Sequence, residues 1–300
     1  MIRLNGVEVE FGNYPNGETL VPEIVQHGDI PHGVELRYET DADLIHLWLL
    51  AGHLRGLKKL TIAYMPYSRM DRAVGNHCFS LEHIATLINE MEFDVVYIVE
   101  PHSDGTLHRV ARSRSVTVSD QLLHTWVFPE VGFDQDLDYV VFPDEGASTR
   151  YARWLSEEQK YITATKTRDF DTGEITGIVV ADVDQYGLPV RAHGDSKAVI
   201  WDDLCSRGGT FMGVGQQLKD MGFAEVHLYV THLESTVLEG PLLKEGSPID
   251  SVYATDSMQW MNRPIPVLGA GKYPKMLKGR FPQLRIRELT LSNQAGRVVA

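Results

Sequence analysis

Residues 198–210 have the sequence Ala198-Val199-Ile200-Trp201-Asp202-Asp203-Leu204-Cys205-Ser206-Arg207-Gly208-Gly209-Thr210. The apolar start of this stretch predicts a buried strand, and the residues from Thr210 onward have the apolar spacing of a helix. A strand, a small-residue loop and a helix start leave backbone N–H groups free to bind an anion such as a phosphate. The adjacent carboxylates of Asp202 and Asp203 can accept hydrogen bonds from a vicinal diol. Phosphate and diol together point to a ribose 5-phosphate group; an ordinary strand-to-helix turn is the alternative.

The composition limits the classes of protein to which the chain can belong. With 300 residues, it is long enough for one large domain or two of ordinary size. Its formal net charge of −13 at pH 7 argues against a nucleic-acid partner, although local basic residues and Mg²⁺ can still hold phosphates. Cys78 and Cys205 form neither a CxxC pair nor a zinc spacing, so we expect a reducing, cytoplasmic location. No signal-peptide core or membrane-spanning apolar run is visible, so we expect no membrane partner.

Short, continuous apolar runs alternate with helical patterns along the chain. Such runs are typical of a parallel sheet that is covered on both faces. Strands are predicted at 60–64, 95–99, 139–142, 178–181, 198–201 and 226–230, and helices at 41–57, 81–91 and 210–221, with Ser80 as an N-cap and Gly222 as a C-cap. The alternation predicts an α/β protein. Because the pattern runs twice, we expect two tandem domains, residues 1–119 and 120–300, each a mostly parallel sheet flanked by helices.

Polar side chains follow several of the predicted strands, where open α/β sheets bind their ligands. Arg69 and Asp71 follow one strand, and guanidinium groups suit phosphate oxygens. His102 follows the next strand, where a neutral imidazole could ligate a metal or contact a phosphate. Asp144 begins a strand–loop–helix junction from which it could reach Mg²⁺, which favours oxygen ligands. The alternatives are a surface ion pair, a structural histidine and a capped helix start.

Two basic residues, Lys166 and Arg168, stand directly before the polar, glycine-containing segment 169–174. We predict that this segment is a mobile lid. A lid that carries cations could close on a transferring phosphoryl group and neutralise its developing charge. A solvated charged loop is the alternative interpretation.

Taken in order, these segments resemble those of the ribose-phosphate pyrophosphokinase family, the phosphoribosyl pyrophosphate synthetases. Residues 202–210 are similar to the family's Asp-Asp-x-x-Asp-Thr-Gly-Gly-Thr loop, and residues 166–168 are similar to its flexible-loop Lys-x-Arg. The other matching segments are 14–18 (Phe-x-Asp-Gly-Glu in the family), 66–72 (Pro-Tyr-x-x-Ala-Arg-Gln-Asp-Arg), His102 (Asp-Leu-His), 143–146 (Pro-Asp-x-Gly-Gly), 231–232 (Thr-His) and 255–257 (Thr-Asn-Ser). The resemblance covers residues 10–260, and the part from Met261 onward does not align.

The resemblance implies two phosphoribosyltransferase-like domains and a Mg²⁺-dependent enzyme. Such an enzyme transfers the β,γ-diphosphoryl group of ATP to the C1 hydroxyl of ribose 5-phosphate and releases AMP. It implies a catalytic role for Lys166 and Arg168, and a metal-binding role for His102 and Asp144. It further implies ATP contacts by Tyr14, Asn16, Glu18, Arg69, Met70, Asp71 and His102, and ribose-phosphate contacts by Asp202, Asp203, Ser206, Arg207, Gly208, Gly209 and Thr210. Because the family's loop at 14–18 reaches a neighbouring subunit, we expect a homo-oligomer, either a dimer or a hexamer built from dimers.

The chain departs from the family pattern beside the predicted phosphate loop. Ser206 replaces an acidic residue and Arg207 replaces the usual Thr, while Asn16 replaces Asp and Met70 replaces Gln on the ATP side. Segment 185–194 is longer than is usual in the family and could make room for a larger acceptor. The changed charge favours a more anionic 5′ substituent, as in ADP-ribose, whose product would be ADP-ribose pyrophosphate, as in NAD salvage. Alternatively, Arg207 tightens the binding of a monophosphate, or faces solvent.

Two further classes of function stay open at this point. A phosphoribosyltransferase would use the diphosphate product, but one domain would suffice for that activity. A non-catalytic, synthetase-associated subunit would not need the retained Lys166, Arg168, His102 and Asp202. A ribose 5-phosphate diphosphokinase is therefore the leading hypothesis.

Overall fold

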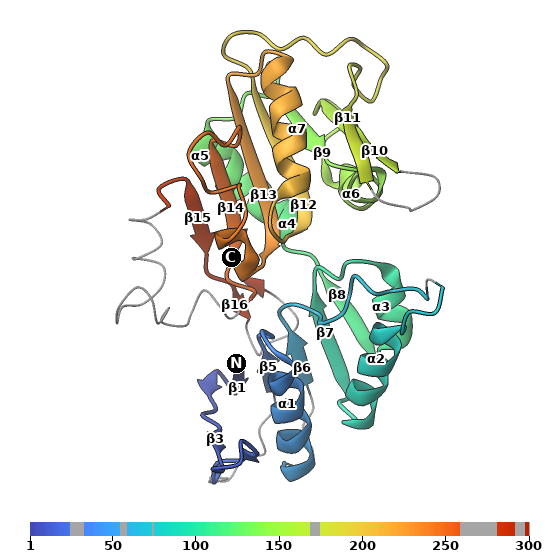
Figure 1. Cartoon of the computed structure of the whole chain (residues 1–300), viewed down its shortest axis with the longest axis vertical. Helices are drawn as coiled ribbons and strands as arrows, with labels where there is room; N and C mark the ends of the chain where they lie inside the picture. Colours follow the sequence, from blue (N-terminus) through green and yellow to red (C-terminus); the bar gives the residue numbers. More distant parts are fainter. Residues whose placement is uncertain are drawn as a thin grey trace. The chain divides into compact units, whose positions relative to one another are not determined.

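The computed structural model describes residues 1–24, 33–54, 59–73, 75–168, 175–258, 281–291 and 298–299. The chain divides into two compact units (Figure 1). Unit 1 contains Met1–Val118, Ser257–Trp260 and Leu289–Ala300, and unit 2 contains Ser119–Asp256 and Met261–Glu288. Each unit has a mostly parallel sheet with helices packed on it, which confirms the predicted α/β fold class. The predicted domain boundary between residues 119 and 120 stays a prediction.

Unit 1 is built on a six-stranded sheet of order β2-β1-β5-β6-β7-β8. Strands β5 to β8 are parallel, and β1 pairs with β5 antiparallel. The strands are β1 (Ile2–Leu4), β2 (Val7–Glu8), β5 (Gly33–Leu36), β6 (Lys59–Ile62), β7 (Val95–Val99) and β8 (Ser113–Val116). Two separate antiparallel pairs are β3 (Gly12–Asn13) with β4 (Thr19–Leu20), and β16 (Thr290–Leu291) with β17 (Val298–Val299). Arg37 donates to the carbonyl of Leu289 at 2.8 Å, and this hydrogen bond ties the segment that begins at Leu289 to the rest of unit 1.

The helices of unit 1 pack their apolar faces on the sheet. They are α1 (Asp41–His53), α2 (Ser80–Glu90) and α3 (Asp104–Arg109). Leu44, Leu47 and Leu50 of α1 are buried in the core because they recur at helical spacing on one face. The predicted N-cap at Ser80 is wrong, because Ser80 is already the first helical residue and Phe79 takes the capping position. Residues 55–57 of the first predicted helix lie outside the described residues.

Unit 2 is built on a seven-stranded sheet of order β11-β10-β9-β12-β13-β14-β15. All neighbouring strands are parallel except β11, which pairs antiparallel with β10 at the edge. The strands are β9 (Tyr139–Phe142), β10 (Tyr161–Arg168), β11 (Ile175–Val180), β12 (Lys197–Cys205), β13 (Glu225–Leu233), β14 (Ser251–Thr255) and β15 (Leu284–Arg287). The apolar runs predicted to be strands at 139–142, 198–201 and 226–230 form the centre of this sheet, where both faces are covered.

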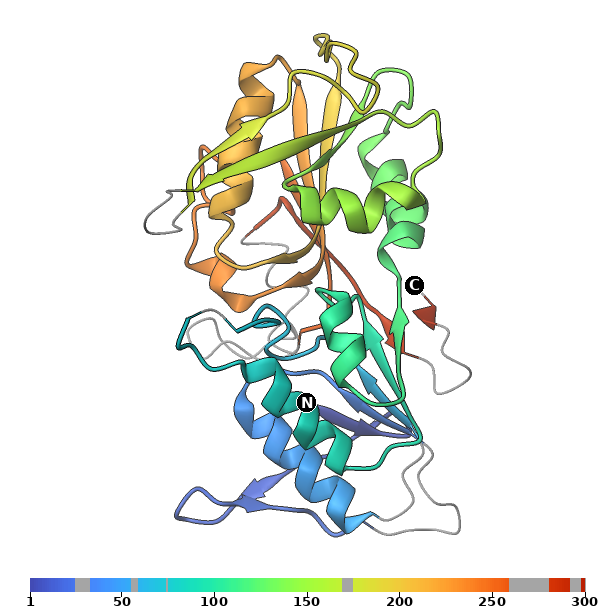
Figure 2. The same ribbon diagram turned by 90° about the vertical axis from the view of Figure 1, so that its right-hand side faces the viewer.

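Helices cover both faces of the unit 2 sheet. In the views of Figures 1 and 2, α7 (Gly209–Asp220) lies on one face, and α4 (Ser119–Leu122), α5 (Phe128–Val131) and α6 (Glu145–Tyr151) lie on the other. The described part of unit 2 also has a π-helical segment, η1 (Leu123–Val127), and two short 3₁₀ helices, η2 (Ala152–Trp154) and η3 (Ser235–Leu238). The predicted C-cap Gly222 is one residue late, since Met221 is the cap and Gly222 follows with a φ of +99°. None of the described helices is long and apolar enough to cross a membrane.

Aromatic packing joins α6 to the central strand β12. The ring of Trp201 stacks on Tyr151 with 4.5 Å between centroids, and Tyr229 of β13 lies 6.5 Å away on a nearly parallel plane. All three rings are fully buried. Burial of such large rings stabilises the unit by a few kcal/mol each, so the middle of β12 and the end of α6 are held firmly together.

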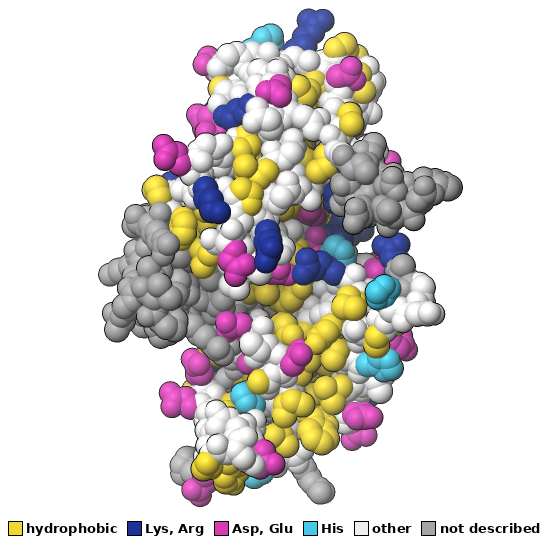
Figure 3. Space-filling view, viewed as in Figure 1, with side chains coloured by type: hydrophobic (Ala, Val, Ile, Leu, Met, Phe, Trp, Pro, Cys, Tyr) yellow, Lys and Arg dark blue, Asp and Glu magenta, His cyan; other side chains and the backbone are white. Residues whose placement is uncertain are grey.

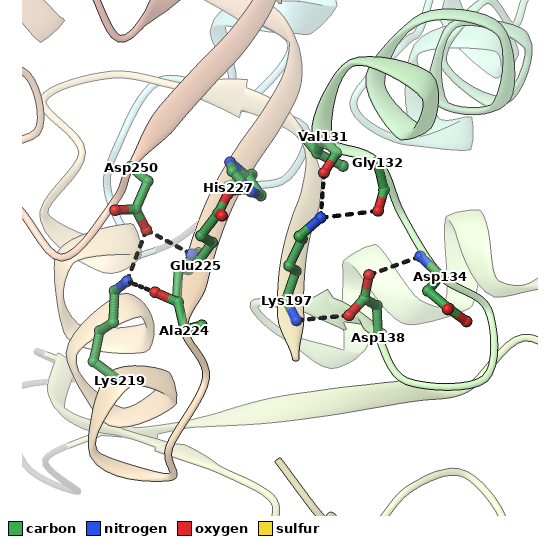
Figure 4. A network of polar contacts seen from close by, with 11 residues as sticks. Val131, Gly132, Asp134, Asp138, Lys197, Lys219, Ala224, Glu225, His227 and Asp250 are labelled. Carbon is green, nitrogen blue, oxygen red and sulfur yellow. Dashed lines mark hydrogen bonds and ion pairs between the residues drawn. The ribbon is translucent and has the colours of Figure 1, made fainter. Parts of the chain in front are cut away.

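Polar side chains tie the loops to the amino end of the same sheet (Figure 4). The ammonium of Lys197 donates to the carbonyls of Val131 and Gly132 at 2.6 and 2.9 Å, and its backbone N–H donates to Asp138 at 2.7 Å. In a second group, the ammonium of Lys219 donates to the carbonyl of Ala224 and to the carboxylate of Asp250, which also accepts the backbone N–H of Val226. Burial lowers the pKa of the neighbouring His227, although Glu225 and Asp250 oppose that shift.

Candidate functional site

Asp202 and Asp203 lie within β12, because the strand continues to Cys205 instead of ending before the carboxylates as predicted. Successive side chains of a strand point to opposite faces. The backbone N–H of Asp203 donates to Oδ1 of Asp202 at 2.8 Å. Burial, and then the negative charge of Asp203, raise the pKa of Asp202 well above its usual range. The surroundings of Asp202 therefore disfavour its charged form and favour its protonated form.

Two cations hold carboxylates at this end of the sheet. Nζ of Lys166 lies 2.5 Å from Oδ2 of Asp144, and a guanidinium nitrogen of Arg150 lies 2.8 Å from Oδ1 of Asp203. Asp144 is also the N-cap of α6, since its Oδ1 accepts the N–H of Ala147 at 2.9 Å. Burial opposes ionisation of Asp144, but these hydrogen bonds prevail and lower its pKa. Asp144 and Asp203 are thus each paired with a basic side chain.

The sheet topology explains why these residues meet. Strand β9 lies between β10 and β12, and all three are parallel, so their carboxyl ends share one edge. Asp144 follows β9, Lys166 lies near the end of β10, and Asp202 and Asp203 lie near the end of β12. The predicted residues Asp144, Lys166, Asp202 and Asp203 are therefore brought together in unit 2. Arg168 ends β10, and the predicted lid 169–174 lies outside the described residues.

Arg150 was not among the predicted site residues. It lies on α6 and is mostly buried, and its guanidinium group also stands 5.4 Å from the ring centroid of Tyr151. Its position follows from the helix that Asp144 caps, because that helix returns the side chain towards Asp203. The signal in the sequence that pointed to it was its place as the basic residue of the strand–loop–helix junction at 143–150.

The loop between β12 and α7 has the geometry of an anion cradle. Gly208 has a φ of +85°, a conformation that favours glycine, and it caps α7, whose first residues are Gly209 and Thr210. The first N–H groups of a helix have no partners within the helix and carry partial positive charge. The helix begins one residue before the prediction, so Gly208, Gly209 and Thr210 all stand at its amino end.

Residues 234–242 pack against this loop. The hydroxyls of Ser206 and Thr236 are hydrogen-bonded at 2.9 Å. A Cβ at Gly240 would lie only 2.0 Å from the carbonyl oxygen of Arg207, so the two backbones touch. The position of the loop therefore depends on a glycine that lies far along the chain.

The side chain of Arg207 points to solvent. It is 71% exposed and pairs at 3.2 Å with Glu239, which is 66% exposed. Exposed pairs of this kind contribute about 0–1 kcal/mol. Because Glu239 offsets the added positive charge, the pair gives little local preference for a more anionic acceptor. Of the three alternatives for Arg207, the structure therefore has the one in which its side chain faces solvent.

The long segment 185–194 lies at the amino end of the unit 2 sheet. Gln185 accepts the N–H of Tyr161 at the start of β10, and the segment leads into Lys197 at the start of β12. It lines a cavity of about 340 Å³ together with Tyr139 and Lys160. Lys197 and Asp202 are about 16 Å apart along the strand at about 3.3 Å per residue. The expectation that this segment enlarges the acceptor site is therefore wrong.

In unit 1, two predicted segments meet at the carboxyl ends of β6 and β7. Arg69 and Met70 are exposed on a turn closed by the bond from Met70 N–H to the Tyr67 carbonyl at 2.9 Å. His102 follows β7, after Glu100, a buried residue with a φ of +41°. The Cβ of Asp71 lies 3.8 Å from the position a Cβ would take at Gly105, so the two segments are adjacent.

Residues Tyr14, Asn16 and Glu18 occupy a separate, exposed hairpin between β3 and β4. The Tyr14 N–H donates to the Glu18 carbonyl at 2.8 Å, and the Asn16 amide donates to the Glu18 carboxylate at 2.7 Å. The hairpin is thus a formed turn with its tip in solvent. Its predicted role at the site of a neighbouring subunit stays a prediction.

A preassembled metal centre is absent from the part of the chain that the structure describes, where no three His, Cys, Asp or Glu side chains gather suitably. Mg²⁺ needs few protein ligands, because water and substrate phosphates fill most of its coordination shell. The carboxylate of Asp144 fits such a site, since it is a hard oxygen donor whose pKa is already lowered.

Comparisons with known proteins agree with the motifs, although no family model matches the chain. The ribose-phosphate pyrophosphokinase of Thermococcus kodakarensis is 26% identical over 278 residues, 91% of each chain. The enzyme of the same name from Pyrococcus furiosus is 25% identical over 276 residues, 90% of this chain and 91% of the relative. The phosphoribosylpyrophosphate synthetase structure from Mycobacterium smegmatis has the same fold, with a TM-score of 0.68, 19% identity and coverage of 94% of this chain and 86% of that one. The chain therefore resembles the ribose-phosphate pyrophosphokinase family over most of its length, as a divergent relative.

Proposed function

We propose that this chain is an ATP-dependent diphosphotransferase that acts on ribose 5-phosphate. It transfers the β,γ-diphosphoryl group of ATP to the C1 hydroxyl and yields phosphoribosyl pyrophosphate and AMP. The observation that carries this proposal is the cluster of Asp144, Arg150, Lys166, Asp202 and Asp203 at one sheet edge. The relatives named ribose-phosphate pyrophosphokinase support the same reaction.

The ribose 5-phosphate binds at the end of β12. Asp202 and Asp203 accept hydrogen bonds from the ribose hydroxyls, and Arg150 orients Asp203. The 5′-phosphate lies against the loop of Ser206, Arg207, Gly208, Gly209 and Thr210, with Arg207 contributing only its backbone, where the N–H groups at the start of α7 face it. The acceptor is thereby fixed at both ends.

Transfer of the diphosphoryl group requires positioning and neutralisation of charge more than covalent catalysis. Lys166, with Arg168 on the same strand, supplies the positive charge at the transferred group. The Lys166 ammonium is paired with Asp144, and because an ammonium has three donors it can also reach a phosphate oxygen. The ATP side is formed by Arg69, Met70, Asp71 and His102, with Tyr14, Asn16 and Glu18 of a neighbouring subunit.

Mg²⁺ fits the chemistry of the Asp144 carboxylate, which is a hard oxygen donor. When bound, the metal neutralises part of the polyphosphate charge. Asp144 would then have three roles, since the same carboxylate also caps α6 and holds Lys166.

Ribose 5-phosphate is preferred to ADP-ribose as the acceptor. The argument for a larger, more anionic acceptor rested on the charge of Arg207 and on segment 185–194. Arg207 is exposed and paired with Glu239, and the segment lies at the opposite end of the sheet. Neither feature therefore supports ADP-ribose over the smaller sugar phosphate.

We also propose that the chain forms a homo-oligomer in the cytoplasm. The exposed hairpin at 14–18 suits contact with a second subunit, and Figure 3 shows hydrophobic side chains gathered on one face of unit 1. Ile45 and Trp48 of α1 are 47% and 46% exposed, and exposed apolar patches commonly mark protein contacts. Cys78 and Cys205 are both free thiols, which suits a reducing compartment.

One assay tests the proposed reaction. The protein is incubated with MgATP and either ribose 5-phosphate or ADP-ribose, and AMP release is measured. We expect AMP with ribose 5-phosphate. AMP with ADP-ribose alone would reject the proposed acceptor, and no AMP with either would favour a phosphoribosyltransferase or a non-catalytic subunit.

A further inference from the structure

Asp41, the first residue of α1, joins two tyrosines through one carboxylate oxygen. Its Oδ1 accepts a hydrogen bond from the hydroxyl of Tyr38 at 2.8 Å and another from the hydroxyl of Tyr67 at 2.7 Å. Tyr38 lies in the connection between β5 and α1, three residues before Asp41. Tyr67 comes from the segment that follows β6, which includes Arg69 and Asp71. The carboxylate therefore ties this post-strand segment to the start of a helix.

The backbone at Tyr67 needs such a tie. Its φ is +59°, in the left-handed region, which costs a residue other than glycine about 1–2 kcal/mol. The next residue, Ser68, is buried, whereas Arg69 and Met70 are exposed. The bond from the Met70 N–H to the Tyr67 carbonyl closes the turn at 2.9 Å. A strained residue thus stands at the hinge from which the exposed Arg69 projects.

The tie is present throughout the physiological pH range. The hydrogen bond to Asp41, burial and the charge of Asp41 raise the pKa of the Tyr67 hydroxyl. Burial and the same carboxylate also raise the pKa of Tyr38. Both hydroxyls therefore keep the protons that they donate to Asp41.

We propose that Asp41 is a positioning residue for the nucleotide: through the hydroxyl of Tyr67 it holds the strained turn that presents Arg69 to ATP. This inference rests on the proposed function, because it assigns Arg69 to the ATP phosphates. Asp41 itself touches no substrate in this arrangement. Its effect is on the affinity for ATP and leaves the acceptor untouched, because the ribose 5-phosphate site belongs to unit 2.

The test compares variants that remove one partner at a time. Tyr67→Phe removes the hydroxyl on the turn, and Tyr38→Phe is the matched control, because it removes an equivalent hydroxyl from the same oxygen. We expect Tyr67→Phe and Asp41→Ala to raise the KM for ATP about 5–10-fold, the size of one lost charged hydrogen bond. The KM for ribose 5-phosphate and kcat should change by less than about twofold, as should every parameter of Tyr38→Phe. Asp41→Asn retains an acceptor oxygen and should recover most of the ATP affinity.

A second measurement does not depend on activity. Hydrogen exchange of the Met70 amide should become faster in Tyr67→Phe and Asp41→Ala, and stay unchanged in Tyr38→Phe. Unchanged exchange, or equal effects of the two tyrosine variants on ATP, would overturn the proposal. If the wild-type protein releases no AMP, the proposed function fails on that result alone. Calorimetric titration with ATP then replaces KM, and equal ATP affinity in wild type and Tyr67→Phe would overturn the role of Asp41.

Discussion

The ammonium nitrogen of Lys166 lies 2.5 Å from Oδ2 of Asp144, although the two residues belong to different strand–loop units of the sheet. Parallel pairing of β9 and β10 produces this contact by placing both carboxyl ends at one edge. The carboxylate both attracts the lysine and caps α6. The ion pair with Asp144 therefore holds the proposed catalytic cation in a defined position.

Lys166→Ala is expected to reduce AMP release at least about 100-fold, because positive charge at a transferring phosphoryl group contributes several kcal/mol to transition-state stabilisation. Nucleotide binding, measured by calorimetry, should be nearly unchanged. Lys160→Ala is the control, since that lysine lies just before the same strand at the opposite end of the sheet. Unchanged turnover in Lys166→Ala would remove its catalytic role.

Asp202→Asn is expected to stabilise the fold while abolishing acceptor binding. Burial and the charge of Asp203 raise the folded-state pKa of Asp202 above its unfolded value of about 3.9. The contribution of such a group is fully present below the unfolded pKa and is lost as the pH rises through the folded pKa. Asn keeps the bond from the Asp203 N–H without the charge, so Tm should rise by roughly 2–4 °C at pH 7.

The same variant should shift Tm much less at pH 4, where the carboxyl of the wild-type residue is already largely protonated. Circular dichroism at the two pH values measures the difference. Asp195→Asn, at an exposed position in the same unit, serves as the control. Equal stabilisation at both pH values would contradict the assigned electrostatic cause.

Gly240→Ala is expected to disturb the phosphate loop. The new Cβ would lie 2.0 Å from the carbonyl oxygen of Arg207, a clash with backbone that no rotamer can relieve. We expect the KM for ribose 5-phosphate to rise about tenfold or more, with the KM for ATP nearly unchanged, because misplacement by about 1 Å is costly. Gly194→Ala is the control, since nothing lies within 4 Å of its Cβ position. Equal KM values in the two variants would show that the loop does not bind the phosphate.

Arg207→Ala is expected to have little effect on either acceptor. The guanidinium is exposed and paired with Glu239, so its loss should change stability by less than about 1 kcal/mol. The KM for ribose 5-phosphate and the KM for ADP-ribose, if that compound is used, should each change by less than about threefold. A selective loss with ADP-ribose would instead restore the charge argument for the larger acceptor.

The strands that could be predicted from the sequence are those with continuous apolar runs. Tyr139–Phe142 and Val95–Val99 are continuous apolar runs, and the structure has them at the same residues. Tyr161–Arg168 was missed as a strand because polar threonines and Lys166 interrupt its apolar residues. That alternation reflects its place beside the edge strand β11, where one face is less covered.

The candidate site was predictable only as far as its residues follow strands. Asp144 and Asp202 were found because ligand-binding side chains gather at strand ends in this class of fold. The pairing of Arg150 with Asp203 and the approach of Gly240 to Arg207 join distant parts of the chain, so no local pattern contains them. The direction of Arg207 was likewise set by Glu239, which no motif includes.

The stack of Trp201 on Tyr151 gives this molecule a built-in optical probe. The indole directly precedes Asp202, and Tyr151 directly follows Arg150, so the stack borders the carboxylate cluster through the chain itself. Its emission should therefore change when a sugar phosphate alters the charge beside it. Ligand binding could then be followed by fluorescence without a label.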